Sequence, residues 1–243
     1  MNKKNKRSKK RFFPNSLTIF NMFFGFTSIV FIMKGDYIIA GVLILLAGFM
    51  DIFDGKIARL LGISSKFGVE FDSLADTVSF CVAPSILVYS LYAKDLQIIQ
   101  GLVLSFVPLI CGSVRLAKYN LETVEDNHKS YFIGLSTPIS TVTILAFMYF
   151  NHQIGGQDFY GDPNIALGLV LVLGILMLSP IHFPKVPLIT FKSSSKNSIL
   201  LIIMIACSLS IVVWKGFALL PVCLGYILTN TFLWFIKLRP SNI

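Results

Sequence analysis

Four aspartates lie close together in a strongly apolar stretch of the chain: Asp51, Asp54, Asp72 and Asp76. Residues three or four positions apart share one face of a helix, so Asp51 would point the same way as Asp54, and Asp72 the same way as Asp76. Carboxylates gathered this closely need a counter-charge, and ionisable groups inside a membrane protein usually mark function. Oxygen ligands of this kind suit Mg²⁺ or Mn²⁺, and four acids favour two ions over one.

Small and polar residues follow the first aspartate pair. Gly55 and Ala58 would leave a shallow strip along the helix, where a flat ligand such as a nucleotide could approach the backbone. Arg59 lies one turn after Gly55 and could hold a phosphate. Ser64 and Ser65 lie where the next helix is expected to begin, which is a suitable position for binding a phosphate.

Surface salt bridges or an ion pathway could also account for acidic residues in such a chain, but both are less well supported. Surface salt bridges would need a matching basic stripe, and only Lys56, Arg59 and Lys66 are nearby in the sequence. A cation transporter would place acids along a path through the membrane and often has inverted repeats. Here the acids gather at one level, and the sequence has no evident internal repeat. The transporter remains the alternative from a different functional class.

The elements that must position the aspartates are membrane-spanning helices. The chain has 243 residues, of which 55% are hydrophobic and 14% charged. About 20 apolar residues are needed for a helix to cross a bilayer. We therefore expect an all-α, polytopic transmembrane bundle of about eight spans. The expected spans are residues 14–33, 37–62, 68–92, 98–119, 134–152, 164–182, 196–214 and 217–236.

The distribution of basic residues predicts the orientation of the chain. With these spans, every Lys and Arg of the 21 except Lys34, Lys94 and Lys215 falls on the side of the N-terminus. This bias predicts an integral protein of the cell membrane with its N-terminus and the aspartates facing the cytoplasm. The net charge is +9, and the basic residues lie between apolar segments. This pattern favours contact with membrane lipids, and no nucleic-acid partner is expected.

Three segments are expected along the chain. Residues 1–11 form a basic cytoplasmic tail. Residues 12–183 form the catalytic core. Residues 184–243 comprise a basic loop and two C-terminal transmembrane helices.

The spacing of the acidic motif resembles the signature of the CDP-alcohol phosphotransferase family. That signature is D-x-x-D-G-x-x-A-R-x8-G-x3-D-x3-D, and the chain matches it without departure from Asp51 to Asp76. The resemblance implies a membrane-embedded fold with a six-helix core, usually dimeric. It also implies an enzyme that moves a phosphoalcohol from a CDP-alcohol to an acceptor hydroxyl and releases CMP.

The resemblance also implies roles for individual residues. The four aspartates resemble the ligands of a di-metal site, and Asp76 also resembles the proposed general base. The residues that correspond to the CDP-lipid site are Gly55, Ala58, Arg59, Ser65 and Gly68.

Flanking segments resemble one branch of the family, the bacterial and archaeal phosphatidylserine synthases. These segments are FPNSLTIFNMFFGF (residues 13–26), FGVEFDSLADTVSFCVAPS (67–85), VRLAKYN (114–120) and FIGLSTP (132–138). That branch often has Gly where this chain has Cys81. The resemblance covers roughly residues 12–140 and implies CDP-diacylglycerol as donor and L-serine as acceptor.

Polar residues on two expected helices are candidates for substrate contacts. Asn15, Thr18 and Asn21 recur every three residues and could contact the cytidine or ribose of the CDP-lipid, or could make hydrogen bonds between helices. Arg115 and Lys118 could bind the carboxylate of serine, or could anchor the helix at the inner membrane face.

The sequence leaves several features of the substrates and metal open. Glycerol 3-phosphate or an inositol phosphate remains an alternative acceptor. A CDP-archaeol donor and the choice between Mg²⁺ and Mn²⁺ also stay open.

Overall fold

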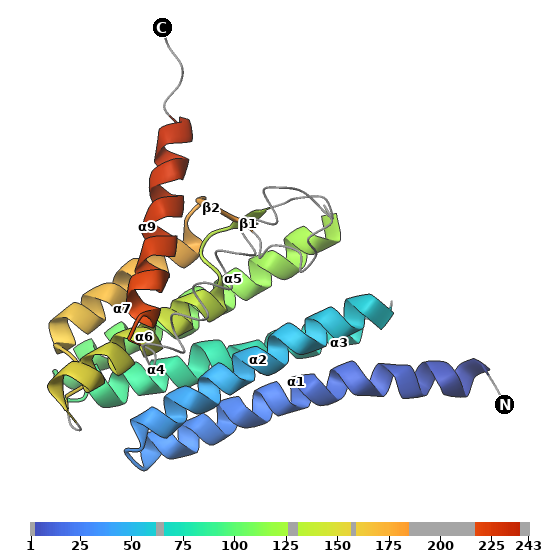
Figure 1. Ribbon diagram of the computed structural model, residues 1–243, viewed down its shortest axis with the longest axis horizontal. Helices are drawn as coiled ribbons and strands as arrows, with labels where there is room; N and C mark the ends of the chain where they lie inside the picture. Colours follow the sequence, from blue (N-terminus) through green and yellow to red (C-terminus); the bar gives the residue numbers. More distant parts are fainter. Residues whose placement is uncertain (1–2, 62–65, 126–130, 157–158, 185–216, 239–243) are drawn as a thin grey trace, which may run out of the picture.

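The computed structural model describes residues 3–61, 66–125, 131–156, 159–184 and 217–238, most of which are helical (Figure 1). The third expected span is a continuous helical path of four pieces, two of them π-helical (η1 and η2). The elements in chain order are α1 (Lys3–Met33), α2 (Tyr37–Leu61), α3 (Lys66–Thr77), η1 (Val78–Val82), α4 (Ala83–Val88), η2 (Tyr89–Ala93), α5 (Ile98–Glu125), β1 (Tyr131–Ile133), α6 (Thr137–Gly155), α7 (Pro163–Leu178), β2 (His182–Pro184) and α9 (Leu219–Leu238).

Local sequence signals set several helix ends. Gly35 adopts a φ of 84° in the short turn between α1 and α2, a conformation that favours glycine. Asp162 caps α7, because its carboxylate accepts hydrogen bonds from the backbone N–H groups of Asn164 (2.8 Å) and Ile165 (3.2 Å). Pro163 then begins the helix, at a position where its missing N–H is tolerated.

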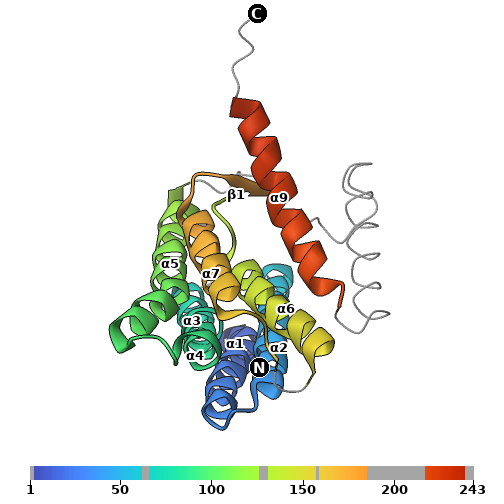
Figure 2. The same ribbon diagram turned by 90° about the vertical axis from the view of Figure 1, so that its left-hand side faces the viewer.

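Helix α6 lies at the centre of the packing. Figure 2 shows it between α2 and α7, while α9 rises steeply from the remaining helices. One face of α6 contributes Leu145 and Met148 to a core shared with α1, α2 and α4, and the adjacent face contributes Ile144 and Phe147 to a core with α7 and α9. Because α6 joins both cores, it supports the helices that carry the acidic motif.

Five of the described helical paths are long and apolar enough to cross a membrane, and α7 is a shorter apolar helix. These paths are Ser16–Met33, Tyr37–Gly55, Phe67–Ala93, Ile98–Leu121 and Leu219–Ile236. Helix α6 is not among these five, and its Ser140, Thr141 and Thr143 side chains are buried inside the protein. The expected span 196–214 lies outside the described residues. The prediction of a polytopic helical membrane protein is confirmed, whereas the number of eight spans stays a prediction.

A small sheet corrects one expected boundary. The sixth expected helix continues to residue 182, but α7 ends at Leu178. Ser179 precedes a proline and has an extended ψ of 156°, as steric contact with the proline ring requires. The chain then forms β2, which pairs antiparallel with β1 so that Phe132 lies opposite Phe183.

Helix α1 approaches η1 closely at Gly25, which leads to a first prediction. A Cβ atom placed on Gly25 would lie 2.8 Å from the Cα atom of Ser79, so backbone would have to move. We expect Gly25→Ala to destabilise the protein by about 1–3 kcal/mol, the usual cost of overpacking. Thermal unfolding in detergent would measure the loss.

Gly168 on α7 provides the matched control for this prediction. A Cβ atom there would meet nothing within 4 Å. Gly168→Ala should leave stability unchanged or raise it by up to about 1 kcal/mol, because alanine favours helix more than glycine does. If Gly25→Ala and Gly168→Ala unfold at the same temperature, the close approach of α1 and η1 at Gly25 is contradicted.

Candidate functional site

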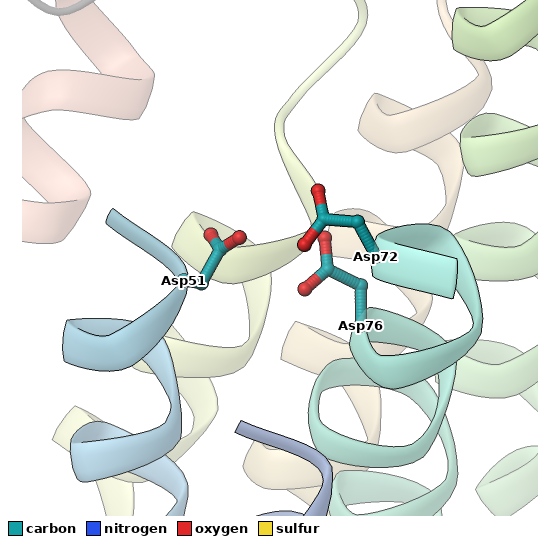
Figure 3. Close-up of side chains that lie close together, drawn as sticks. All are labelled: Asp51, Asp72 and Asp76. Carbon is teal, nitrogen blue, oxygen red and sulfur yellow. The ribbon is translucent and has the colours of Figure 1, made fainter. Parts of the chain in front are cut away.

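Three of the four aspartates meet where the end of α2 faces α3. Figure 3 shows Asp51 on α2 directed toward Asp72 and Asp76 on α3. One carboxylate oxygen from each residue lies within 4.8 Å of the others. The predicted spacing accounts for this geometry, because Asp72 and Asp76 are one turn apart and α2 and α3 run in opposite directions across a short connection.

Asp54 lies beside this group and makes several polar contacts of its own. Its side chain is 4% exposed, and its Oδ2 atom accepts a 2.9 Å hydrogen bond from the hydroxyl of Thr18 on α1. The backbone N–H of Gly55 also donates to the carboxylate, and the carboxyl groups of Asp54 and Asp72 lie within hydrogen-bonding distance. The structure therefore brings Asp54 to the site but leaves it outside the group of three.

Helix α1 also contacts Asp76. The Nδ2 atom of Asn21 donates a 3.0 Å hydrogen bond to Oδ1 of Asp76. Asn21 is fully buried and Asp76 is 9% exposed. Thr18 and Asn21, predicted from the sequence to contact the CDP-lipid, are thus placed against the aspartates by the fold.

The chemistry of the cluster suits a divalent cation. Within the part of the chain that the structure describes, Oδ1 of Asp72 is buried and has no hydrogen-bond partner. Burying several carboxylates together is very unfavourable without a cation or protons to compensate the charge. The ligand set contains only oxygen, which matches the preference of Mg²⁺ and Mn²⁺.

Several other predicted residues can be placed only in part. Gly55 follows Asp54 on α2, Gly68 lies one turn before Asp72 on α3, and both are partly exposed. The side chains of Asn15, Ala58 and Arg59, and the whole of Ser65, lie outside the part of the chain that the structure describes. Glu70 is exposed, in agreement with its predicted position away from the aspartate stripe.

The two predicted acceptor-binding residues are in different environments. Arg115 is 7% exposed, donates a 3.2 Å hydrogen bond to the hydroxyl of Thr137, and lies over the ring of Phe132 at 5.9 Å. Lys118 is exposed. Arg115 is therefore held inside the protein against Thr137 and Phe132, whereas Lys118 is on the surface.

Sequence reasoning identified the segments that contain Asn120 and Thr137 but not the contacts these residues make. Asn120 on α5 and Ser73 on α3 exchange hydrogen bonds, with Nδ2 of Asn120 2.9 Å from Oγ of Ser73. Thr137 begins α6 and holds Arg115. These pairs join helices distant in the sequence, so spacing along one helix gives no signal for them.

Comparison with known proteins gives the family of this chain. The family model for CDP-alcohol phosphatidyltransferase matches residues 11–222. A protein of Helicobacter pylori named CDP-diacylglycerol–serine O-phosphatidyltransferase is 33% identical over 226 residues, covering 91% of this chain and 90% of that protein. Archaetidylserine synthase of Methanothermobacter thermautotrophicus is 35% identical over 175 residues, covering 71% and 70%. The chain belongs to the CDP-alcohol phosphatidyltransferase family.

Proposed function

We propose that the chain transfers the phosphatidyl group of CDP-diacylglycerol to the hydroxyl of L-serine, giving phosphatidylserine and CMP. The partly buried cluster of Asp51, Asp72 and Asp76 carries the proposal, because it provides an all-oxygen cation site in a protein of this family. The names of the relatives support serine as the acceptor. Because the chain belongs to this family, it is an enzyme and not the cation transporter considered as an alternative.

The aspartates would bind the metal that this chemistry requires. Asp51, Asp54, Asp72 and Asp76 would hold one or two Mg²⁺ or Mn²⁺ ions, which when bound neutralise the diphosphate and favour the departure of CMP. Asp54 would complete the set from beside the three clustered carboxylates. The partly exposed Gly55 and Gly68 would lie along the CDP-lipid, together with Ala58, Arg59 and Ser65.

The transfer step needs a base and an in-line approach. Asp76 would accept the proton of the serine hydroxyl, whose oxygen would form a bond to the phosphorus that carries the lipid. The bond between that phosphorus and the bridging oxygen would break, and CMP would leave with this oxygen. Arg115 would orient the serine carboxylate, because a buried guanidinium is well suited to bind that group.

The wider setting is proposed from the sequence and the family. The distribution of Lys and Arg supports a cytoplasmic N-terminus and active site. The family resemblance supports a homodimer within the lipid bilayer, and the expected six-helix core would end near residue 183. An ether-lipid donor stays as an alternative, since the archaeal relative is named archaetidylserine synthase.

Acceptor-dependent release of CMP would test the proposed function. Purified full-length protein in detergent would be given CDP-diacylglycerol, Mn²⁺ or Mg²⁺, and one acceptor at a time: L-serine, glycerol 3-phosphate or inositol 1-phosphate. We expect CMP only with serine and only in the presence of metal. A parallel reaction with CDP-archaeol would compare the two lipid donors.

Each contrary outcome of this assay has a distinct meaning. Release of CMP with a different acceptor would retain the family chemistry and overturn serine as the substrate. Release without any divalent ion would overturn the proposed metal site. Absence of CMP with every acceptor and both donors would overturn the proposed reaction itself.

A further inference from the structure

The helix that carries Asp76 loses its regular hydrogen bonding just after this residue. The π-helical turn η1 begins at Val78, and the N–H of Ala83 donates to the carbonyl of Val78 five residues earlier. Pro84 follows and has no N–H to donate to the carbonyl of Phe80, four residues before it. A π-helical turn inside an α-helix is often found at a functional site, and here it separates Asp76 from the regular helix that follows.

Neighbouring helices supply the missing contacts. The hydroxyl of Thr141 on α6 donates a 2.8 Å hydrogen bond to the carbonyl of Phe80. The hydroxyl of the preceding residue, Ser79, donates a 3.0 Å hydrogen bond to the backbone carbonyl of Asn21 on α1. The position of Asp76 therefore depends on α1 and α6 as well as on its own helix.

Asn21 on α1 makes two hydrogen bonds with the segment that contains Asp76 and Ser79. Its carbonyl accepts from Ser79, and its side-chain Nδ2 donates to Asp76 at 3.0 Å. Gly25, one turn further along α1, allows the backbone to approach Ser79 closely. The side-chain amide is thus held at a fixed place beside the Asp76 carboxylate.

The side chain of Asn21 is not explained by stability alone. It is fully buried, and its Oδ1 atom has no hydrogen-bond partner among the described residues. A buried polar atom without a partner is unfavourable for stability, so the amide is kept here although its oxygen is unpaired. The hydrogen bond that its side chain does donate goes to an aspartate of the proposed metal site.

We propose that Asn21 is a positioning residue, which holds the Asp76 carboxylate in the orientation needed at the metal site. The inference rests on the proposed function, because the role of Asp76 comes from it. It differs from the prediction that Asn21 contacts the CDP-lipid. A residue that orients a metal ligand without touching the metal typically contributes about 10- to 100-fold to metal affinity or activity.

The test compares Asn21→Leu with the wild type in the full-length protein in detergent. Leucine has a similar size and cannot donate a hydrogen bond. We expect kcat for CMP release to fall about tenfold, and the dissociation constant of Mn²⁺, measured by electron paramagnetic resonance without substrates, to rise about tenfold. The KM for CDP-diacylglycerol should stay within about twofold of the wild type, because the change acts through Asp76.

Ser28→Ala is the matched control on the same helix. Ser28 is fully buried and donates a 2.6 Å hydrogen bond to the carbonyl of Gly25 within α1, away from the aspartates. This variant should keep the wild-type kcat and Mn²⁺ affinity. If Asn21→Leu does not yield a folded protein, Asn21→Ala removes the same donor without adding volume and is measured in its place.

The outcomes separate this inference from the proposed function. Normal kcat and normal Mn²⁺ affinity in a folded Asn21 variant would overturn the positioning role. A raised KM for CDP-diacylglycerol with unchanged Mn²⁺ affinity would overturn it in favour of direct lipid contact. If the wild type releases no CMP, the proposed reaction fails, while the Mn²⁺ titration still decides whether Asn21 positions Asp76.

Discussion

Asp72→Asn is expected to lower the rate of CMP release by about 1,000-fold or more. The Oδ1 atom of Asp72 is buried without a hydrogen-bond partner in the described structure. The carboxyl group of Asp72 also lies within hydrogen-bonding distance of the carboxyl group of Asp54. Replacing the carboxylate by an amide removes a charge from the proposed cation site at almost constant volume. Loss of several kcal/mol of transition-state stabilisation corresponds to a rate effect of this size.

Glu70→Gln provides the matched control for this change. Glu70 lies two residues before Asp72 on the same helix, but its side chain is exposed and outside the carboxylate cluster. The same change from carboxylate to amide should leave CMP release within about twofold of the wild type, because exposed charges contribute little. Equal activity of Asp72→Asn and the wild type would contradict the proposed metal site.

The aspartate cluster is the part of the site that the sequence predicts best. Helical periodicity places Asp72 and Asp76 on one face, and a short connection returns the chain beside Asp51. These are local relations, so spacing along the chain is enough to find them. Spacing does not show that Asp54 would be held by Thr18, because that contact depends on how α1 packs against α2.

Tertiary packing also explains the features that sequence reasoning missed. Arg115 and Lys118 have the same charge and lie three residues apart, yet only Arg115 faces Thr137 and Phe132. The β1–β2 pair was absent from the predicted all-helical fold because three-residue strands have too little periodicity to detect. Local chemistry at Gly35 and Asp162 explains two helix ends, but the end of α7 lies four residues before the expected one.

Arg115→Met is expected to reduce kcat/KM for serine by about 100-fold. A buried cation within a membrane protein is costly to retain and usually serves a function. Hydrogen bonds to a charged group contribute at least about 1.5 kcal/mol each, so loss of two such bonds to the serine carboxylate, about 3 kcal/mol, would lower the rate about 100-fold. Methionine keeps an unbranched apolar stem and removes the charge and the hydrogen-bond donors. Serine titrations at saturating CDP-diacylglycerol would measure the change.

Two further variants distinguish recognition of serine from anchoring of the helix. Arg115→Lys keeps the charge but not the planar group that contacts both Thr137 and Phe132, so it should recover only a small part of the activity. Lys118→Met removes an exposed charge on the same helix and should change KM for serine by less than about twofold.

An anchoring role for Arg115 would give the opposite pattern. A charge that only fixes α5 at the inner membrane face would be equally well supplied by lysine, and its loss would lower the unfolding temperature without changing KM for serine. Recognition of the acceptor instead predicts that KM for serine rises while KM for CDP-diacylglycerol does not. The buried position of Arg115 over Phe132 favours recognition, because an anchoring cation would be expected in contact with water and headgroups.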